Sequence, residues 1–66
     1  MENRIRVARA EVRMTQQQLA EAVGVSRQTI HAIENGRFVP STVLALKIAR
    51  LFAKPVEELF QLEAGD

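Results

Sequence analysis

The side chains that could do chemistry in this sequence are one histidine, eight carboxylates, and nine arginines and lysines. Cysteine is absent, which excludes disulfides and thiolate zinc sites. His31 has no second imidazole or thiol with which to share a metal ion, and a lone histidine on a helix is usually a surface residue. Glu57 and Glu58 are adjacent, so on a helix their carboxylates point about 100° apart and cannot act as a facing pair. The sequence therefore argues against an enzyme and against a metal site.

Other signals of ligand binding are also missing. The chain has no glycine-rich phosphate loop and no nucleophile elbow, and 66 residues leave little room for a pocket. The longest apolar run, residues 43–46, is too short for a signal peptide or a membrane span. We expect a cytoplasmic protein with no cofactor, no small-molecule ligand and no membrane contact.

The charged residues are unevenly distributed along the chain. Residues 1–37 hold six arginines and four glutamates, residues 38–54 hold three basic residues and no acid, and residues 55–66 hold four acids and no base. The formal charges of these segments are +2, +3 and −4, although the whole chain carries only +1. A basic face would suit a polyanion such as nucleic acid. Helices with ordinary solvated charges fit the same distribution, so both interpretations stay open at this point.

The elements that must position these side chains are predicted to be helices. Apolar residues recur three and four positions apart, and no stretch alternates apolar and polar residues as a half-buried strand does. Glycines at positions 24 and 36 and prolines at 40 and 55 divide the chain. We predict an all-α fold, with helices over residues 3–13, 16–23, 27–35, 42–52 and 56–60.

Caps and apolar stripes support these helices. Thr15 and Gln18 form a capping-box pattern, and Ser26 and Ser41 are suited to cap the next two helices. Val25 is expected to pack on the helix that follows it as a hydrophobic staple. The predicted buried residues are Ile5, Ala8, Val12, Leu19, Ala20, Val23, Ile30, Ile33, Leu44, Ala45, Ile48, Leu51 and Phe52.

The second and third helices form a helix-turn-helix pattern, because only the turn Gly24-Val25-Ser26 separates them. Ala20 is small enough for the two helices to cross closely, and the apolar Val25 can fill the angle between them. A helix held out in this way fits the DNA major groove, which is about 12 Å wide. A tight helical corner also occurs in proteins that bind no DNA, so the spacing alone does not decide the function.

The stretch from Thr15 to Arg37, TQQQLAEAVGVSRQTIHAIENGR, is followed by PSTVLALKIARLF and PVEELF. In order and spacing it resembles the Cro/C1-type helix-turn-helix repressors, also called the xenobiotic-response-element family, and within them the minimal single-domain members. The resemblance covers residues 3–60. It implies one five-helix lambda-repressor-like domain over residues 1–66, with the motif at 15–37 and, in some members, a small two-stranded antiparallel sheet formed by the termini.

The resemblance also implies roles for individual residues. Arg27 and Gln28 are expected to read bases, since Arg pairs with guanine and Gln with adenine through two hydrogen bonds each. Gln16 is expected to bind phosphate at a helix N-terminus. The full set of expected base contacts is Arg27, Gln28, Thr29, His31 and Ala32, and that of expected phosphate contacts is Gln16, Ser26, Asn35, Arg37 and Arg13.

Some positions are expected to serve structure, and others depart from the family pattern. Glu34 is expected to pair with Arg9 in preference to contacting DNA. Ala53 and Arg13 replace common family glycines, and we expect the corner at Ala53 to be rebuilt because a left-handed Ala costs about 1 kcal/mol. Ala8 replaces a larger aliphatic residue, which predicts a less well packed first helix.

The chain has more apolar residues than one small core is expected to bury, and a domain of this size buries only about 60% of its unfolded surface. We therefore expect a two-fold homodimer, built by residues 38–40 and 55–66, that presents two recognition helices about 34 Å apart. The residues expected in its interface are Phe38, Val39, Val56, Phe60 and Leu62.

The predicted function is a sequence-specific DNA-binding transcriptional regulator, a homodimeric repressor that binds a near-palindromic operator through the major groove. Its expected partners are double-stranded DNA and a second copy of itself. The alternative is a protein-interaction module, such as an antitoxin or adaptor, with secondary DNA binding. Antitoxins usually add a segment that wraps the toxin, and a six-residue tail is short for that purpose.

Overall fold

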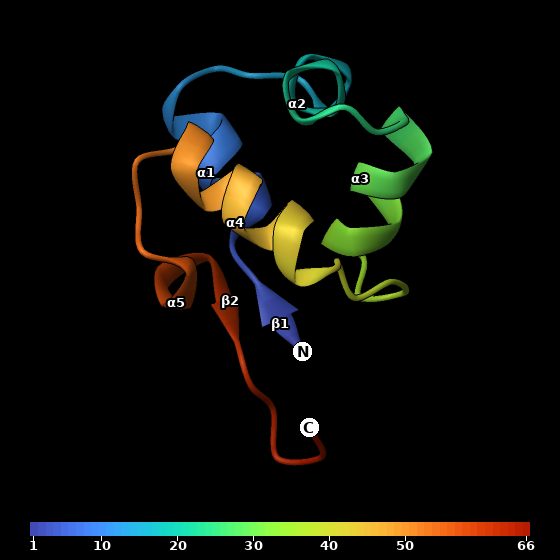
Figure 1. The fold of residues 1–66 in the computed structure, drawn as a ribbon, viewed down its shortest axis with the longest axis vertical. Coiled ribbons are helices and arrows are strands. Elements are labelled where there is room, and N and C mark those ends of the chain that lie inside the picture. Colours follow the sequence, from blue (N-terminus) through green and yellow to red (C-terminus); the bar gives the residue numbers. More distant parts are fainter.

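Helices dominate the computed structural model, which describes all 66 residues. In Figure 1, α4 crosses the middle of the domain, with α2 above it, α3 to the right, and α5 and a small sheet below. The predicted five-helix architecture is confirmed, and so is the antiparallel sheet that the family resemblance implied. The elements are β1 (Glu2–Asn3), α1 (Ile5–Glu11), α2 (Gln16–Val23), α3 (Arg27–Glu34), α4 (Thr42–Leu51), α5 (Val56–Leu59) and β2 (Phe60–Gln61).

Side-chain caps start three of the helices where the sequence predicts. The Thr15 hydroxyl accepts the Gln18 N–H at 3.0 Å, and the Gln18 side-chain oxygen accepts the Thr15 N–H at 2.9 Å. This completes the predicted capping box. Ser26 and Ser41 cap α3 and α4, because each hydroxyl accepts a backbone N–H from the first turn of its helix.

Left-handed residues end four of the helices, and only two of them are glycines. Gly24 and Gly36 have φ values of 78° and 73°, whereas Arg13 and Ala53 reach 54° and 53°. After α4, the Ala53 N–H donates to the Arg50 carbonyl at 3.1 Å, so the usual hydrogen bonds of such a helix end are made. The expectation that the corner at Ala53 is rebuilt is therefore wrong. The corner keeps its left-handed geometry, and Ala53 adopts this backbone conformation although its Cβ atom disfavours it.

Replacing Ala53 by glycine is expected to stabilise the domain. The substitution relieves about 1–2 kcal/mol of backbone strain in the folded state. Glycine also gives the unfolded chain more conformational entropy, which costs about 0.4–1 kcal/mol of stability. The net gain in stability is roughly 0.5–1 kcal/mol. Thermal melts at a fixed protein concentration should show a midpoint about 4 °C higher. The matched control is Ala22→Gly, at an exposed position inside α2, which should lower the midpoint. Equal shifts in the two variants would contradict the strain at Ala53.

One hydrophobic core joins all five helices. Most of the predicted stripe is buried, but Val12 and Leu51 are 57% and 39% exposed, so their predicted burial is wrong. Val12 is the C-cap of α1 and Leu51 is the last residue of α4, so both lie at helix ends. Ala45 and Phe52 are half-buried against the core. The buried residues of this core are Ile5, Ala8, Leu19, Ala20, Val23, Ile30, Ile33, Leu44, Ile48, Ala49, Leu59 and Phe60.

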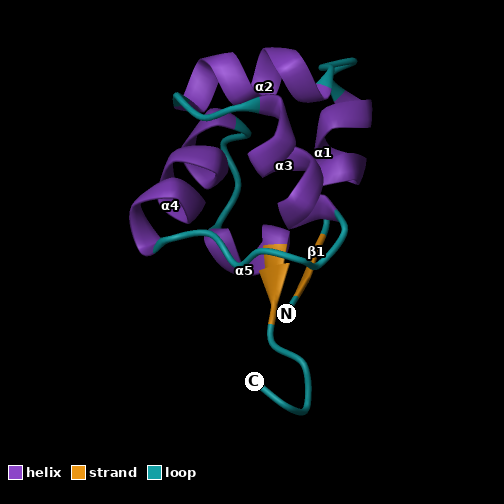
Figure 2. Cartoon of the chain, turned by 90° about the vertical axis from the view of Figure 1, so that its right-hand side faces the viewer, coloured by secondary structure: helices purple, strands orange, loops and turns teal.

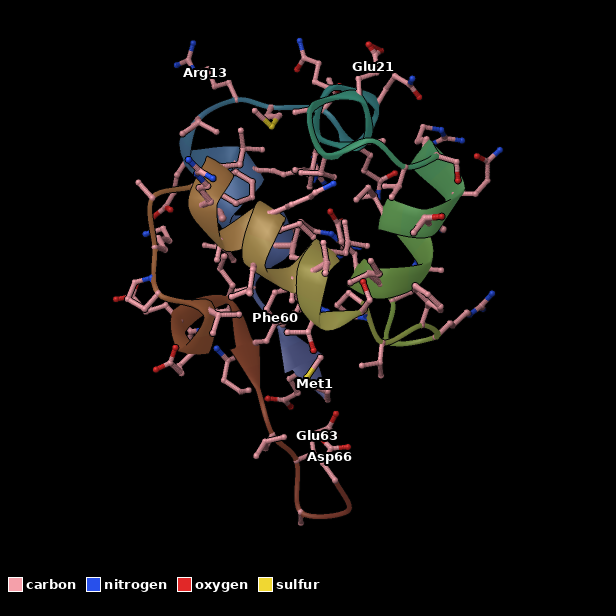
Figure 3. All side chains as sticks on the ribbon, in the orientation of Figure 1. Met1, Arg13, Glu21, Phe60, Glu63 and Asp66 are labelled. Atoms are coloured by element: carbon pink, nitrogen blue, oxygen red, sulfur yellow. The ribbon has the colours of Figure 1, made fainter.

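The two ends of the chain meet at the sheet. The Arg4 N–H donates to the Leu59 carbonyl at 2.8 Å, and the Asn3 side chain donates to the Ile33 carbonyl at 2.8 Å. In Figure 3, Met1 lies beside Glu63 and Asp66 of the C-terminal tail, and its ammonium group is 2.9 Å from the Glu63 carboxylate. The sheet therefore fixes α1 and the C-terminal end of α3 relative to α5.

Candidate nucleic-acid interface

The corner between α2 and α3 has the geometry of a helix-turn-helix. Ala20 is fully buried, which lets the two helices cross closely, and Val25 is half-buried against the core. Gly24 turns the chain with its left-handed backbone, and Ser26 restarts it as the cap of α3. In Figure 2, α3 occupies the centre of the view, between α2 above and the loop of residues 35–41 below. The predicted corner is thus confirmed as a structural unit.

The first turn of α3 presents two long polar side chains to solvent. Arg27 and Gln28 are exposed, and neither makes a hydrogen bond or an ion pair within the chain. Thr29 differs, because it is half-buried and its hydroxyl lies 3.0 Å from that of Ser26. Ala32 is half-buried one turn later. Of the predicted base contacts on this turn, Arg27 and Gln28 are the two whose polar groups are fully available.

A buried ion pair fixes the other end of α3. The Glu34 carboxylate is 0% exposed and accepts hydrogen bonds from Arg9 Nε at 2.7 Å and Arg9 Nη2 at 3.0 Å. Arg6 adds a longer contact of 3.4 Å from an exposed position. The pairing of Glu34 with Arg9 is therefore as predicted, and it ties α3 to α1.

The pKa of Glu34 reflects these contacts. Burial by itself would raise the pKa, but the hydrogen bonds from Arg9 and Gln16, the charge of Arg9 and the hydrogen bond from Arg6 outweigh it and hold the pKa below its ordinary value. The carboxylate therefore stays ionised and neutralised by arginine. As a result, the one acidic residue of α3 adds no free negative charge to the surface of this helix.

A hydrogen-bonded chain that sequence reasoning missed continues from Glu34 across the α2–α3 corner. The Gln16 amide nitrogen donates to Glu34 at 3.2 Å and lies 3.4 Å from Nδ1 of His31. Nε2 of the same ring lies 3.0 Å from the Asn35 amide. Gln16 and His31 are 15 residues apart, and only the crossing of α2 over α3 brings them together. No local sequence pattern contains this contact.

The residues predicted to contact phosphate occupy different settings. Asn35 and Arg37 are exposed at the C-terminal end of α3, and Arg37 has no acidic partner. The Ser26 hydroxyl already serves as the helix cap, and Gln16 is half-buried with its amide engaged. Arg13 projects from the side of the domain away from α3 in Figure 3, so it does not join the cluster around that helix. The phosphate contacts themselves stay predictions.

Unpaired basic side chains outnumber paired ones. Arg6, Arg9 and Lys54 have carboxylate partners within 4.0 Å. The four acids of the C-terminal segment lie on α5 or beyond it, below the helix-turn-helix unit in Figure 1. The negative charge of the last segment therefore lies apart from the helix-turn-helix unit. The basic residues without an acidic partner are Arg4, Arg13, Arg27, Arg37, Lys47 and Arg50.

The residues predicted at a dimer interface also separate into two groups. Phe38, Val39 and Leu62 are 49%, 62% and 81% exposed, so the chain itself does not cover them. Phe60 is only 9% exposed and points into the core, and Val56 is half-buried against it. The expectation that Phe60 exceeds what one core can bury is therefore wrong. The exposed positions 43 and 46 on α4, which the sequence analysis did not assign to a surface, add apolar area.

These features define a helix-turn-helix domain whose recognition helix is basic at its start and neutralised at its end. A family model described as Helix-turn-helix matches residues 5–59. The chain belongs to the Cro/C1-type helix-turn-helix family of DNA-binding transcriptional regulators. None of the helices combines the length and the apolar character that crossing a lipid bilayer requires.

Similar proteins come from both bacteria and archaea. The chain is 48% identical over 63 residues to an uncharacterized HTH-type transcriptional regulator of Bacillus subtilis, YgzD, with 96% of each chain covered. It is 52% identical over 60 residues to an uncharacterized HTH-type transcriptional regulator of Archaeoglobus fulgidus, covering 91% of this chain and 86% of the relative. These relatives are similar over nearly their whole length, so the resemblance is not confined to the motif.

Solved structures share the fold. The restriction-modification controller protein C.AhdI from Aeromonas hydrophila superposes with a TM-score of 0.77 at 30% identity, covering 85% of each chain. The clp gene regulator ClgR from Corynebacterium glutamicum superposes with a TM-score of 0.76 at 30% identity. That match covers 82% of this chain and 57% of ClgR, so the present chain spans little more than half of that regulator.

Proposed function

We propose that this chain is a cytoplasmic homodimeric repressor that binds a near-palindromic operator through the major groove. The observation that carries the proposal is the first turn of α3, where the exposed Arg27 and Gln28 have no partner within the chain. Long polar side chains left free at the start of a recognition helix can form bidentate hydrogen bonds with base edges. Repression then follows from occupancy, since a protein seated on a promoter excludes other proteins from it.

We assign base recognition to the start of α3, and positioning of the protein on the phosphates to residues around this helix. Arg27 suits a guanine and Gln28 an adenine, while Ala32 offers only a methyl contact to thymine. Arg37 and the N-terminus of α2 supply charge and backbone N–H groups for phosphates on either side of the groove. His31 and Asn35 lie between these two sets in the chain.

The exposed Phe38, Val39 and Leu62 support a two-fold dimer. Residues 38–40 directly follow α3, and the tail follows β2, so an interface there leaves the recognition helices free. The helical repeat of DNA then requires the two copies of α3 to lie about 34 Å apart, which is one helical turn. Because Phe60 lies in the core, the proposed interface rests on Phe38, Val39 and Leu62.

The test is selection of bound duplexes from a random DNA pool at about 0.15 M salt, followed by sequencing. We expect enrichment of an inverted repeat whose half-sites are about 10 base pairs apart. Affinity for that duplex should fall about 10³–10⁵-fold between 50 and 200 mM salt if the dimer neutralises roughly 6–10 phosphates.

Two results would contradict the proposal. Failure to enrich any sequence would favour a protein-interaction module, whose binding need not depend on salt in this way. A monomer in sedimentation equilibrium, both free and with the selected duplex, would overturn the dimer while leaving DNA binding in place. The salt series must use one duplex and one pH, because both also change affinity.

A further inference from the structure

The ring of His31 lies between two side-chain amides, and the nitrogen atoms of both amides face ring nitrogens. The Gln16 amide nitrogen faces Nδ1 at 3.4 Å, and the Asn35 amide nitrogen faces Nε2 at 3.0 Å. A neutral imidazole has one N–H and one lone pair, so it can accept a hydrogen bond from only one of the two amides. One amide must therefore turn its oxygen toward the ring.

The buried carboxylate decides which amide turns. Gln16 donates to Glu34 at 3.2 Å, and an ionised carboxylate only accepts hydrogen bonds, so the nitrogen of the Gln16 amide cannot exchange places with its oxygen. Nδ1 of His31 is then the acceptor, and Nε2 carries the proton. Asn35 turns its oxygen to this N–H and its NH₂ group to solvent. In this state both hydrogens of the Gln16 amide are occupied, one by Glu34 and one by His31.

A protonated ring changes this arrangement. An imidazolium has no lone pair at Nδ1, so it releases one N–H of Gln16 while the contact with Glu34 can persist. The released N–H belongs to the first residue of α2, at the end of the helix where an anion is favoured. The ring also gains a positive charge beside the same position. Both changes favour a phosphate oxygen, which accepts hydrogen bonds and carries negative charge.

The charged groups around the ring keep their charge where imidazoles titrate, between about pH 5 and 8. From α1, Arg9 and Arg6 face the ring indirectly through Glu34, whose pKa is held below its ordinary value. Arg27 is one turn earlier on α3, and Arg37 follows in the next loop, while α2 contributes only the uncharged Gln16. Apart from the imidazole itself, the ionisable groups near the ring are therefore arginines and the ionised Glu34.

We propose that His31 is a positioning residue for DNA binding: its neutral ring withholds the Gln16 amide from phosphate, and its protonated ring releases that amide. DNA binding then takes up a proton, and by linkage a lower pH favours the complex. This inference rests on the proposed function, because it needs a phosphate beside Gln16. It adds a residue that acts through a neighbour and not through a base.

The test measures the affinity of the full chain for the selected duplex by fluorescence anisotropy from pH 5.5 to 8.5, at constant ionic strength. Wild type should bind about fivefold to tenfold more tightly per half-site at pH 5.5 than at pH 8.5, since one released hydrogen bond to phosphate changes affinity by that order. His31→Gln, which keeps a neutral hydrogen-bonding side chain, should show no such rise. Circular dichroism melts of both proteins at both pH values check that each stays folded.

Gln16→Ala separates release of the amide from a simple effect of charge. We expect this variant to lose most of the pH response that depends on His31. If it keeps the whole response, or if wild type and His31→Gln give the same pH profile, the inference is overturned while specific binding, and with it the proposed function, stands. Absence of specific binding at every pH would instead contradict the proposed function.

A second measurement needs no DNA. The ¹⁵N chemical shifts of the His31 ring in the free protein at pH 8.5 distinguish the two neutral tautomers. The hydrogen-bonded chain from Glu34 requires the proton on Nε2. A ring found with its proton on Nδ1 would overturn the inference whatever the DNA result.

Discussion

Replacing Glu34 by alanine is expected to destabilise the domain by about 3–5 kcal/mol, because it breaks a buried ion pair on one side only. The Arg9 guanidinium, whose side chain is 15% exposed, would lose the carboxylate to which it donates at 2.7 and 3.0 Å. Gln16 would lose a hydrogen-bond acceptor as well. For a chain of 66 residues, whose total stability is on the order of 3–10 kcal/mol, this is a large share.

Urea denaturation at pH 7 and a fixed protein concentration measures this loss. The matched control is Arg6→Ala, which removes the other arginine at Glu34. Its side chain is 66% exposed and its contact is 3.4 Å long, so the expected cost is below about 1 kcal/mol. If Glu34→Ala costs no more than Arg6→Ala, the ion pair with Arg9 does not stabilise the fold.

Lowering the pH should also reveal the contribution of this ion pair to folding stability. The folded-state pKa of Glu34 is lowered from its ordinary value of 4.5, so the stabilisation is present above that value and is lost as the pH falls through the lower, folded-state pKa. Wild type should therefore lose stability in that acidic window. The Glu34→Ala variant lacks the group and should show a flatter profile there.

Local signals in the sequence were sufficient to predict most of the helices. Thr15, Ser26 and Ser41 each cap a helix within the first turn, so the residues that define the start are all close in sequence. The family resemblance supplied the ion pair between Glu34 and Arg9, and the terminal sheet. These two features join distant parts of the chain, and composition and periodicity alone do not predict them.

Other features depend on how the helices cross. Val12 and Leu51 continue the apolar stripes of α1 and α4 to the ends of these helices, yet both are exposed. The contact between Gln16 and His31 arises where α2 crosses α3, which a periodic pattern cannot specify. Ala53 shows the opposite case, because it adopts a left-handed corner that backbone preference alone disfavours.

Replacing Gln28 by alanine is expected to weaken binding to the selected duplex by about 1–3 kcal/mol per half-site, and so by about twice that for a dimer. The reason is that Gln28 is exposed on the first turn of α3 and has no hydrogen bond within the chain to preserve. Its amide can therefore donate a hydrogen bond to adenine N7 and accept one from the adenine N6 amino group. Preference for an A·T pair at one position of each half-site should relax.

Gln17→Ala is the matched control, since it removes the same kind of side chain from an exposed position on α2. Gln17 lies on α2 and donates to Glu21 at 3.1 Å, so it is outside the first turn of the recognition helix. Any phosphate contact that it makes would lower affinity for all sequences alike and leave the preferred sequence unchanged. Affinities of both variants for the selected duplex and for each single-base variant of one half-site separate the two roles. An equal loss on every duplex for Gln28→Ala would show that Gln28 positions the protein and does not read a base, and specificity would then have to come from Arg27.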